Sequence, residues 1–388
     1  MAKRTVILVA LLVAMLPALV SSQSALPPRE IQGVEITKVE GWLAIQYFWK
    51  YDPETSTVHP PEWLHEPWEF QTPTQVKWQT EIAVRYGSGA DIVEFNPNLD
   101  HSDYNQILST YLTDCNPEDG NGAGGRAFMI LLEHVFGTKF VVDEYGRADM
   151  SLEVNRQIFE GYIDFVWQNI IWPCRGRYLS WEKKALIYLW SMGDMTGDVP
   201  SLFDKMRAKY PIAFIGSLNI MYLETDESLE AVRSFQALNG FLEYIHYPVL
   251  ATPEEKDKHR IAYSRMVGLY LKNSLILRIQ IGEWEERFKK KYLYFGSMTF
   301  AFDDTKVPER KGLHLPMYPL NEKEVRDFAE IIKRRGGKVA SKMNEYAEGD
   351  AVGLQKCLPE TMDTPDRFVG CGSKRLEILA EYFGRGRK

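Results

Sequence analysis

The chain has 388 residues, enough for one large α/β barrel or for two domains of average size, and 45% of the residues are hydrophobic while 26% are charged. This composition is typical of a globular protein with a substantial core. The formal net charge of −7, without a dominant basic stripe, argues against nucleic acid as the main partner.

The first 25 residues differ from the rest of the chain. Lys3 and Arg4 precede an apolar run over residues 5–20, and small residues follow at 21–25. This pattern predicts an export signal, with an uncleaved membrane anchor as the alternative. Cleavage would remove two positive charges and move the net charge from −7 to −9. No later segment is apolar enough to span a bilayer. Residues 26–388 show no internal repeat and no low-complexity linker, so they are predicted to form one domain.

The chain has four cysteines, and the predicted export makes disulfides between them plausible because disulfides persist in oxidising compartments. Cys357 and Cys371 flank a short loop and would close a small ring if oxidised, which leaves Cys115 and Cys174 as the second pair. The sequence does not fix this connectivity, and free buried thiols remain the alternative. No Cys/His spacing suggests zinc.

Short apolar runs with strand character alternate with longer helical or loop segments along the chain. Strands are predicted at 42–49, 90–96, 127–133, 185–190, 212–217, 241–246, 295–302 and 339–345. Helices are predicted at 74–86, 153–171, 199–209, 227–237, 254–273 and 322–335. Eight alternating units imply parallel strands with right-handed crossovers, so we expect an α/β fold, a single (β/α)8 TIM barrel, with a doubly wound open sheet as the alternative.

The residues at the predicted strand ends are rich in carboxylates, amides, histidines and aromatic rings. Because active sites of (β/α)8 barrels collect at the carboxyl ends of the strands, these residues are the candidates for a site. They are Tyr47, Trp49, Glu94, Asn96, Glu133, His134, Trp190, Asn219, Tyr244, His246, Asp303, Asp304, Asn344, Glu345 and Glu348. This enrichment indicates an enzyme or a sugar-binding protein.

The last predicted strand leads into two carboxylates, Glu345 and Glu348, followed by Gly349. Glycosidic-bond hydrolysis requires such a pair, one group to protonate the leaving oxygen and one to act on the sugar. The alternative is the solvated first turn of a helix, where carboxylates suit the helix dipole.

Two further features have both a functional and a structural interpretation. Asp303 and Asp304 could bind sugar hydroxyls or a cation, or could form an Asx turn or helix cap. The first long loop carries rings that could stack on sugars or pack as a lid, namely those of Trp49, Tyr51, Trp63, His65, Trp68 and Trp78. His134 and His246 are possible acid/base or substrate-orienting groups, or hydrogen-bonded wall residues. No nucleophile elbow occurs, and nothing demands a metal or organic cofactor.

The run Met343-Asn-Glu-Tyr-Ala-Glu-Gly349 resembles the last-strand motif of glycoside hydrolase family 99 and its relatives, Asn-Glu-Trp-His-Glu-Gly or Asn-Glu-Trp-Gly-Glu-Gly. Gln46-Tyr-Phe-Trp-Lys-Tyr-Asp-Pro-Glu54 is similar to the first-strand pattern Tyr-Tyr-x-Trp-Tyr-x-x-Pro-Glu. The segments Arg177–Tyr188 and Phe302–Thr305 also agree in order, so the resemblance covers most of residues 40–385.

The resemblance implies a (β/α)8 endo-acting enzyme that cleaves α-mannosidic linkages with retention. Glu345 would act as a base on the sugar 2-hydroxyl to form a 1,2-anhydro intermediate, and Glu348 would protonate the leaving oxygen and then activate water. Tyr47, Tyr244 and Asn344 would orient the substrate. Tyr346, Ala347 and Asp350 depart from the family pattern, and the usual Ile-Glu-Pro tail is absent, which leaves linkage and sugar open.

The sequence therefore predicts an exported glycoside hydrolase that acts on an α-linked, mannan-like polysaccharide or glycan. Glu345 and Glu348 are its predicted catalytic residues. Its predicted substrate-binding residues are Tyr47, Trp49, Glu133, Tyr244, His246, Asp303, Asp304 and Asn344. A non-catalytic carbohydrate-binding or cell-surface protein on the same barrel is the alternative.

Overall fold

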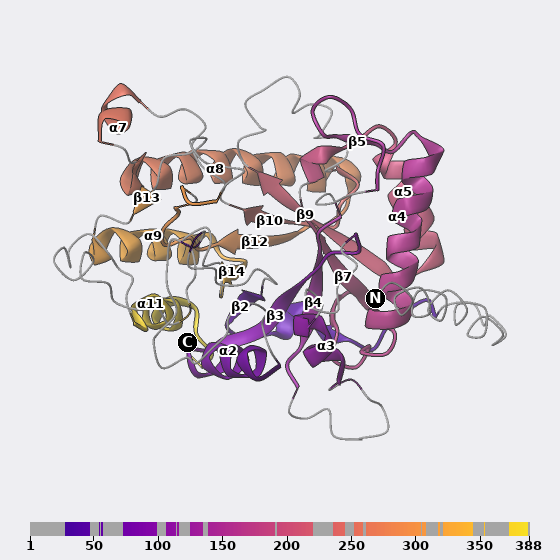
Figure 1. Cartoon of the computed structure of the whole chain (residues 1–388), viewed down its shortest axis with the longest axis horizontal. Coiled ribbons are helices and arrows are strands. Elements are labelled where there is room, and N and C mark those ends of the chain that lie inside the picture. The colour runs from indigo at the N-terminus through magenta and orange to yellow at the C-terminus, as the bar shows by residue number, and fades with distance from the viewer. Residues whose placement is uncertain are drawn as a thin grey trace, which may run out of the picture.

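A computed structural model gives the fold, and Figure 1 shows a central set of strands with helices outside it. The residues that the structure describes are 28–46, 54, 56, 73–98, 106–113, 115, 125–134, 139–190, 192–219, 236–244, 252–258, 261–303, 305–307, 317–318, 321–343, 353 and 372–386.

Eight parallel strands close into a barrel. Each strand pairs with its neighbours in chain order, and the ring closes where β14 pairs with β2. The strands are β2 (Trp42–Gln46), β3 (Ser88–Phe95), β4 (Phe128–Leu132), β7 (Lys184–Leu189), β9 (Ile212–Asn219), β10 (Gly240–Tyr244), β12 (Leu293–Ser297) and β14 (Lys338–Lys342). The predicted (β/α)8 barrel is confirmed, and all eight predicted strands overlap an observed one.

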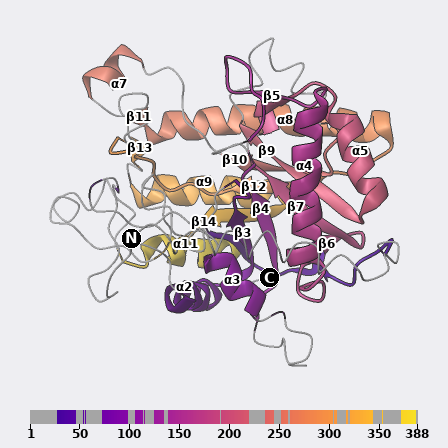
Figure 2. The same cartoon turned by 45° about the vertical axis from the view of Figure 1, so that its right-hand side comes forward.

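Helices cover the outside of the barrel between successive strands (Figure 2). They are α2 (Pro73–Arg85), α3 (Gln106–Thr113), α4 (Glu153–Val166), α5 (Val199–Lys209), α7 (Pro253–Asp257), α8 (Tyr263–Phe288), α9 (Glu322–Arg335) and α11 (Lys374–Phe383). A π-helical turn, Trp167–Ile171, continues α4 to the predicted end at residue 171. The predicted helix at 227–237 lies almost wholly outside the described residues.

Helix α9 shows how local sequence sets these elements. The Asn321 side chain caps its start by accepting a hydrogen bond from the Glu324 amide at 2.9 Å. Gly336 ends it with φ of +71°, a conformation that favours glycine. Its buried residues follow the three- and four-residue spacing of one helix face; they are Val325, Phe328, Ala329 and Ile332.

Two predictions about elements were wrong in detail. The predicted helix at 254–273 is two helices, because residues Ile261–Ala262 (β11) leave the helical path to pair with Met317–Tyr318 (β13). The predicted strand at 295–302 begins at Leu293 and ends at Ser297. In residues 298–302, which follow β12, the side chains of Met298, Phe300 and Phe302 pack in the core between barrel and helices.

Smaller strand pairs lie outside the ring of eight strands. Leu179–Trp181 (β6) forms an antiparallel hairpin with β7 and also pairs in parallel with Val34–Glu35 (β1). Ala148–Asp149 (β5), between β4 and α4, pairs with Met195–Thr196 (β8), between β7 and α5. This second pair ties two neighbouring connections together at the carboxyl ends of the strands.

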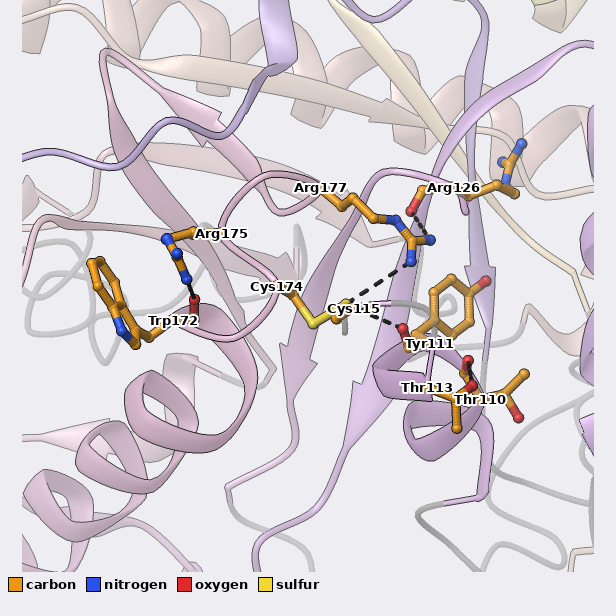
Figure 3. The surroundings of a disulfide bond; sticks show 9 residues. All are labelled: Thr110, Tyr111, Thr113, Cys115, Arg126, Trp172, Cys174, Arg175 and Arg177. Atoms are coloured by element: carbon orange, nitrogen blue, oxygen red, sulfur yellow. Dashed lines mark hydrogen bonds between the residues drawn. A yellow bond between two sulfur atoms is a disulfide. The ribbon is translucent and has the colours of Figure 1, made fainter. Parts of the chain in front are cut away.

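A disulfide joins Cys115, beyond the end of α3, to Cys174, which follows the π-helical turn (Figure 3). The two cysteines are 59 residues apart in sequence, with their Cα atoms 4.9 Å apart. Beside it, the Arg177 guanidinium donates to the Arg126 carbonyl at 2.9 Å. One of the two predicted pairings is therefore present, whereas Cys357 and Cys371 lie outside the described residues.

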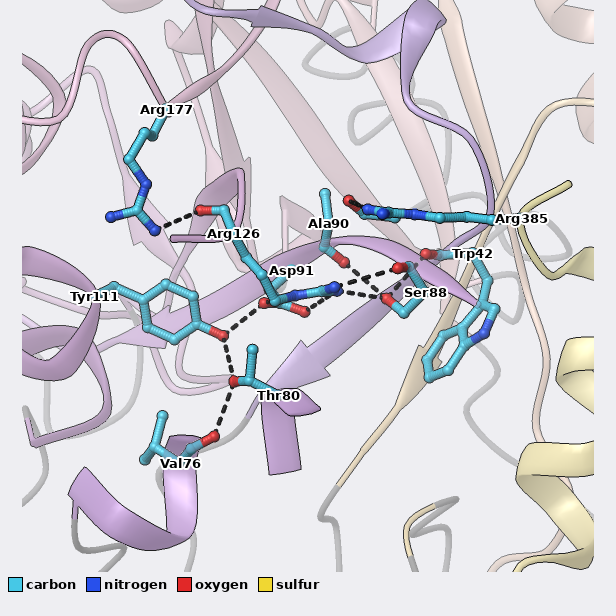
Figure 4. Close-up of polar contacts among 11 residues, drawn as sticks. Trp42, Val76, Thr80, Ser88, Ala90, Asp91, Tyr111, Arg126, Arg177 and Arg385 are labelled. Carbon is cyan, nitrogen blue, oxygen red and sulfur yellow. Dashed lines mark hydrogen bonds and ion pairs between the residues drawn. The ribbon is translucent and has the colours of Figure 1, made fainter. Parts of the chain in front are cut away.

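A buried ion pair fastens the outer surface of β3 to its surroundings (Figure 4). Arg126 donates from Nε and Nη2 to the two carboxylate oxygens of Asp91, at 2.5 and 2.7 Å. The Tyr111 hydroxyl also donates to Asp91, at 2.7 Å, and Arg126 reaches Ser88 at 2.7 Å. Burial, followed by the charge of Asp91, raises the pKa of Tyr111 well above its usual value. Because every member has a partner, this cluster is structural.

Candidate active site

Side chains on a strand alternate between the helix layer and the barrel interior, and the contacts identify each face. On β3, Asp91 meets Tyr111 of α3 and Phe95 stacks on Phe165 of α4, so Ile92 and Glu94 face inward. On β4, the ring of His134 packs on Phe159 of α4, so the neighbouring Glu133 faces inward.

The same reasoning places Lys342 inside the barrel. On β14, Val339 and Met343 belong to the core between barrel and helices, whereas Ala340 belongs to the cluster that includes Leu43 and Ile45. Lys342 pairs in register with Ile45 of β2, which itself pairs with Ile92 of β3. Lys342 therefore shares the inward face of β14 with Ala340.

The floor of the barrel is hydrophobic. Most inward positions below the carboxyl ends of the strands carry fully buried apolar side chains, which pack as a solid core. These residues include Leu43, Ile45, Ile92, Met129, Leu131, Leu186, Ile215, Leu242, Phe295 and Ala340.

Toward the carboxyl ends of the strands the interior becomes charged and polar. Glu94, Glu133 and Lys342 are only 1%, 8% and 6% exposed. Buried charges of this kind are stable only when they are paired or hydrogen-bonded, and each of the three has such an interaction. Two carboxylates and an ammonium at one end of a barrel form a charged centre that a packed core would not contain.

Uncharged polar groups complete this end of the interior. Burial raises the pKa of the Tyr188 hydroxyl, an effect that the Ser217 hydroxyl on the neighbouring strand partly offsets. Ser217 and Ser297 are buried, and Asn96 is buried beyond the end of β3. These groups supply donors and acceptors of the kind that sugar hydroxyls require.

The structure places part of the predicted site. Glu133 directly follows the last residue of β4 and faces inward. Tyr244 is the last residue of β10, in register with Asn219 of β9. Seven predicted residues lie outside the described part of the chain; they are Tyr47, Trp49, His246, Asp304, Asn344, Glu345 and Glu348. In sequence, Asn344, Glu345 and Glu348 come directly after β14 and Met343.

Asp303 does not follow a strand directly, because β12 ends at Ser297. Its Oδ1 accepts hydrogen bonds from the Thr305 amide at 3.1 Å and from the Thr305 hydroxyl at 2.5 Å. These contacts are those of an Asx turn, the structural interpretation that the sequence left open.

His134 is a wall residue. Its ring is fully buried between Phe140 and Phe159, and Nδ1 lies 3.2 Å from the Leu132 carbonyl. Burial lowers the pKa of His134 from 6.5 to about 4, with the Leu132 carbonyl acting in the opposite direction. An imidazole that faces the helix layer and stays neutral cannot serve as an acid/base group in the barrel.

Sequence analysis missed Lys342 and Tyr188 as site residues. The available signal was strand alternation: Lys342 occurs two residues after Ala340, on the face opposite Val339, and Tyr188 occurs two residues after Leu186. Within the described part of the chain, no group of three or more His, Cys, Asp or Glu side chains could hold a metal ion. No described helix is long and apolar enough to cross a membrane.

Three solved structures with a similar fold are described as family 99 endo-α-mannosidases or as a glycoside hydrolase-like protein. A family 99 endo-α-mannosidase from Bacteroides thetaiotaomicron, in complex with bis-tris-propane, is 15% identical, with a TM-score of 0.55 over 88% of this chain and 95% of that one. A second structure of such an enzyme from this organism is 13% identical, with a TM-score of 0.51 over the same shares.

A structure described as a glycoside hydrolase-like protein is 12% identical, with a TM-score of 0.59 over 94% of this chain and 97% of that one. No protein-family model and no curated protein matches the sequence. At these identities the likeness concerns the fold: nearly the whole chain adopts the (β/α)8 architecture of the family 99 structures.

Proposed function

We propose that the chain is an exported glycoside hydrolase that cleaves an α-linked, mannan-like polysaccharide or glycan. The observation that carries the proposal is the change inside the barrel from a hydrophobic floor to a charged carboxyl end around Glu94, Glu133 and Lys342. Enzymes on this fold place their active sites at that end. The likeness to family 99 endo-α-mannosidases over most of both chains supports the choice of reaction.

In the proposed mechanism, Glu345 and Glu348 are the catalytic carboxylates. Glu345 acts, ionised, as the base toward the sugar 2-hydroxyl, and Glu348, protonated, gives its proton to the leaving oxygen. The sugar 2-oxygen bonds to the anomeric carbon as the bond to the leaving oxygen breaks, which gives a 1,2-anhydro sugar. Water deprotonated by Glu348 then attacks the anomeric carbon and opens this ring, Glu345 returns its proton to the 2-oxygen, and the two displacements together retain the anomeric configuration. Two neighbouring carboxylates need different pKa values for these roles, and a buried ammonium such as that of Lys342 favours the ionised form of a nearby carboxylate.

Polar groups at the strand ends have a role in the same mechanism. Glu133 and Tyr244 lie at the ends of β4 and β10, where their side chains would hydrogen-bond sugar hydroxyls and fix the ring for attack. Residues 1–25 are the proposed export signal, and the Cys115–Cys174 disulfide supports an oxidising destination.

The test is hydrolysis of a panel of soluble α-mannans and α-glucans by the exported protein. Glu345→Gln and Glu348→Gln are the test variants, and Glu330→Gln, which removes a partly exposed carboxylate of α9, is the matched control. Product from the parent and the control, but not from the two test variants, would support the proposal. Hydrolysis by Glu348→Gln at the parental rate would refute its role, and NMR of the first-formed anomer would test retention.

The panel also separates the proposed enzyme from a carbohydrate-binding protein on the same barrel. In that alternative no variant forms product, and glycan binding is equal in the parent, Glu345→Gln and Glu348→Gln.

A further inference from the structure

An exposed tyrosine stands at the tip of a hairpin between β4 and α4. Tyr145 is 69% exposed, more than any other large apolar or aromatic side chain in the described part of the chain. Exposure of an aromatic ring costs hydration free energy that burial would recover. One exposed ring is common on protein surfaces, so the case for a function rests on how the hairpin holds this one.

The hairpin that carries Tyr145 is held in one conformation. The Asp143 amide donates to the Arg147 carbonyl at 2.9 Å, and Gly146, with φ of +78°, donates back to the Asp143 carbonyl at 3.0 Å. The Asp143 carboxylate accepts from the amides of Tyr145 and Arg147, at 2.9 and 2.8 Å, and from the Arg147 guanidinium at 2.9 Å. Because the backbone is already fixed, little conformational entropy is lost when a ligand binds to it.

Arg147 also orients the ring. Its guanidinium carbon lies 5.0 Å from the centroid of the Tyr145 ring, which places a cation over one face. With one face covered by Arg147 and most of the side chain exposed, the other face is the surface offered to a ligand. The hairpin thus presents a flat ring with charged groups at its edge.

The base of the hairpin is fastened to the barrel. The fully buried Asn155 side chain accepts from the Val141 amide and donates to the Val141 carbonyl, both at 2.8 Å. The Met150 amide donates to Thr196 in the neighbouring connection at 2.8 Å, next to the β5–β8 pair. Because this segment follows β4 and precedes α4, it lies at the carboxyl ends of the strands, and Figures 1 and 2 show β5 beside the end of α4.

The surface around the ring is mixed in character. Val141 and Val142 are exposed beside it, and Asp143, Glu144 and Arg147 supply polar groups. A pyranose has the complementary chemistry, since one face presents C–H groups that pack on an aromatic ring while its rim carries hydroxyls that bond to charged side chains.

We propose that Tyr145 and Arg147 form an outer glycan-binding subsite, on which a sugar unit of the chain-like substrate stacks away from the bond being cleaved. The proposal rests on the proposed function for the nature of the ligand. Its chemistry requires only a neutral pyranose chain and no co-reactant.

The experiment measures retardation of the full chain in native gels that contain soluble α-mannan or α-glucan, a readout of binding that does not need hydrolysis. The test variant is Tyr145→Ala, with Tyr145→Phe to retain the stacking surface. The matched control is Phe288→Ala, because Phe288 is also an exposed ring, 42% exposed, with the Arg287 guanidinium 5.4 Å from its centroid. It ends α8 and so lies at the opposite end of the barrel.

Loss of one stacked ring should weaken binding by about three- to tenfold. We expect this loss in Tyr145→Ala, with Tyr145→Phe and Phe288→Ala close to the parent. Equal retardation of Tyr145→Ala and the parent, an equal loss in Phe288→Ala, or no retardation of the parent would overturn the subsite. Retardation that depends on Tyr145 in a protein without hydrolytic activity would retain the subsite and refute the proposed hydrolase.

Discussion

The buried imidazole of His134 should make the protein lose stability in mild acid. Burial between Phe140 and Phe159 lowers the pKa of His134 from 6.5 to about 4 in the folded state. The unfolded chain, whose imidazole is solvated, therefore binds a proton first as the pH falls. Stability is fully present above pH 6.5 and is lost progressively as the pH falls toward 4.

The size of the effect follows from the two pKa values. Each unit of difference corresponds to about 1.4 kcal/mol, so the limiting loss below the folded pKa is about 3 kcal/mol. Between pH 7.5 and pH 5, where only part of the proton difference has developed, the same linkage gives a loss of about 2 kcal/mol. The folded imidazole is fully buried, so solvent screening does not reduce this figure.

The assay is urea unfolding of the parent and His134→Asn at a series of pH values from 7.5 to 5. Asparagine keeps a donor for the Leu132 carbonyl but does not titrate. Its substitution lowers stability at every pH by loosening the packing, so the quantity of interest is the difference in pH dependence. We expect the parent to lose about 2 kcal/mol more than the variant over this range.

Phe159→Leu is the control, because it loosens the same packing and retains the imidazole. It should keep the parental pH dependence at a lower absolute stability. If stability depends on pH in the same way in the parent and in His134→Asn, the folded imidazole binds its proton as readily as the unfolded one, and the reasoning is refuted.

Four further predictions concern groups that stabilise the barrel or belong to the candidate site. Arg126→Met should destabilise the protein by about 3–5 kcal/mol in urea unfolding, because it leaves the buried Asp91 carboxylate without its cation; Arg334→Met on the exposed face of α9 is the control, and a loss below 1 kcal/mol would contradict the prediction. Replacing Cys115 and Cys174 together by alanine should lower the free energy of unfolding by about 4 kcal/mol, because the unfolded chain gains the entropy of the released loop. Urea unfolding of the variant and of the parent, without and with a reductant, measures this loss, and an unchanged unfolding midpoint would argue against the disulfide. Lys342→Met should lower the melting temperature and alter the pH dependence of any hydrolysis, since it leaves the carboxylates of the barrel interior unbalanced; Lys323→Met at an exposed position should do neither. Glu133→Gln should reduce hydrolysis by at least tenfold at constant secondary structure by circular dichroism, and full activity would remove it from the site.

The positions of the barrel strands could be predicted well from sequence. Parallel strands that are buried on both faces consist of short apolar runs between polar segments, and runs such as those at 127–133 and 185–190 have this character in the sequence itself. Helix limits were equally clear where a cap was encoded, as at Asn321 and Gly336 of α9.

Elements whose limits depend on packing were predicted poorly. Helix α8 continues to Phe288 beyond its predicted end at 273, although the sequence at its middle is polar. Leu277, Ile281 and Trp284 are buried at helical spacing and hold this half against the barrel. Residues 298–302 have strand character, but β12 ends before them, and their apolar side chains pack in the core between barrel and helices.

The sequence predicts a site at the carboxyl ends of the strands, and its predicted catalytic pair lies outside the described residues. Glu133 was identified because it ends a strand, and its inward direction followed from closure of the barrel. Lys342 was missed because a lysine near the end of a strand usually lies in solvent, and only the pairing of β14 with β2 encloses it. His134 has the same strand-end signal as Glu133, but it points to the opposite face.

The sequence by itself determined the order of strands and helices, the apolar runs that form the floor of the barrel, and the caps that end its helices. These features depend on neighbours a few residues apart, and local propensity and periodicity encode them. Only the tertiary structure decided that the sheet closes, that Cys115 meets Cys174, and that the charges of Glu94, Glu133 and Lys342 share the barrel interior. Each of these depends on contacts between segments far apart in sequence, whose burial gives a charge or a thiol its environment.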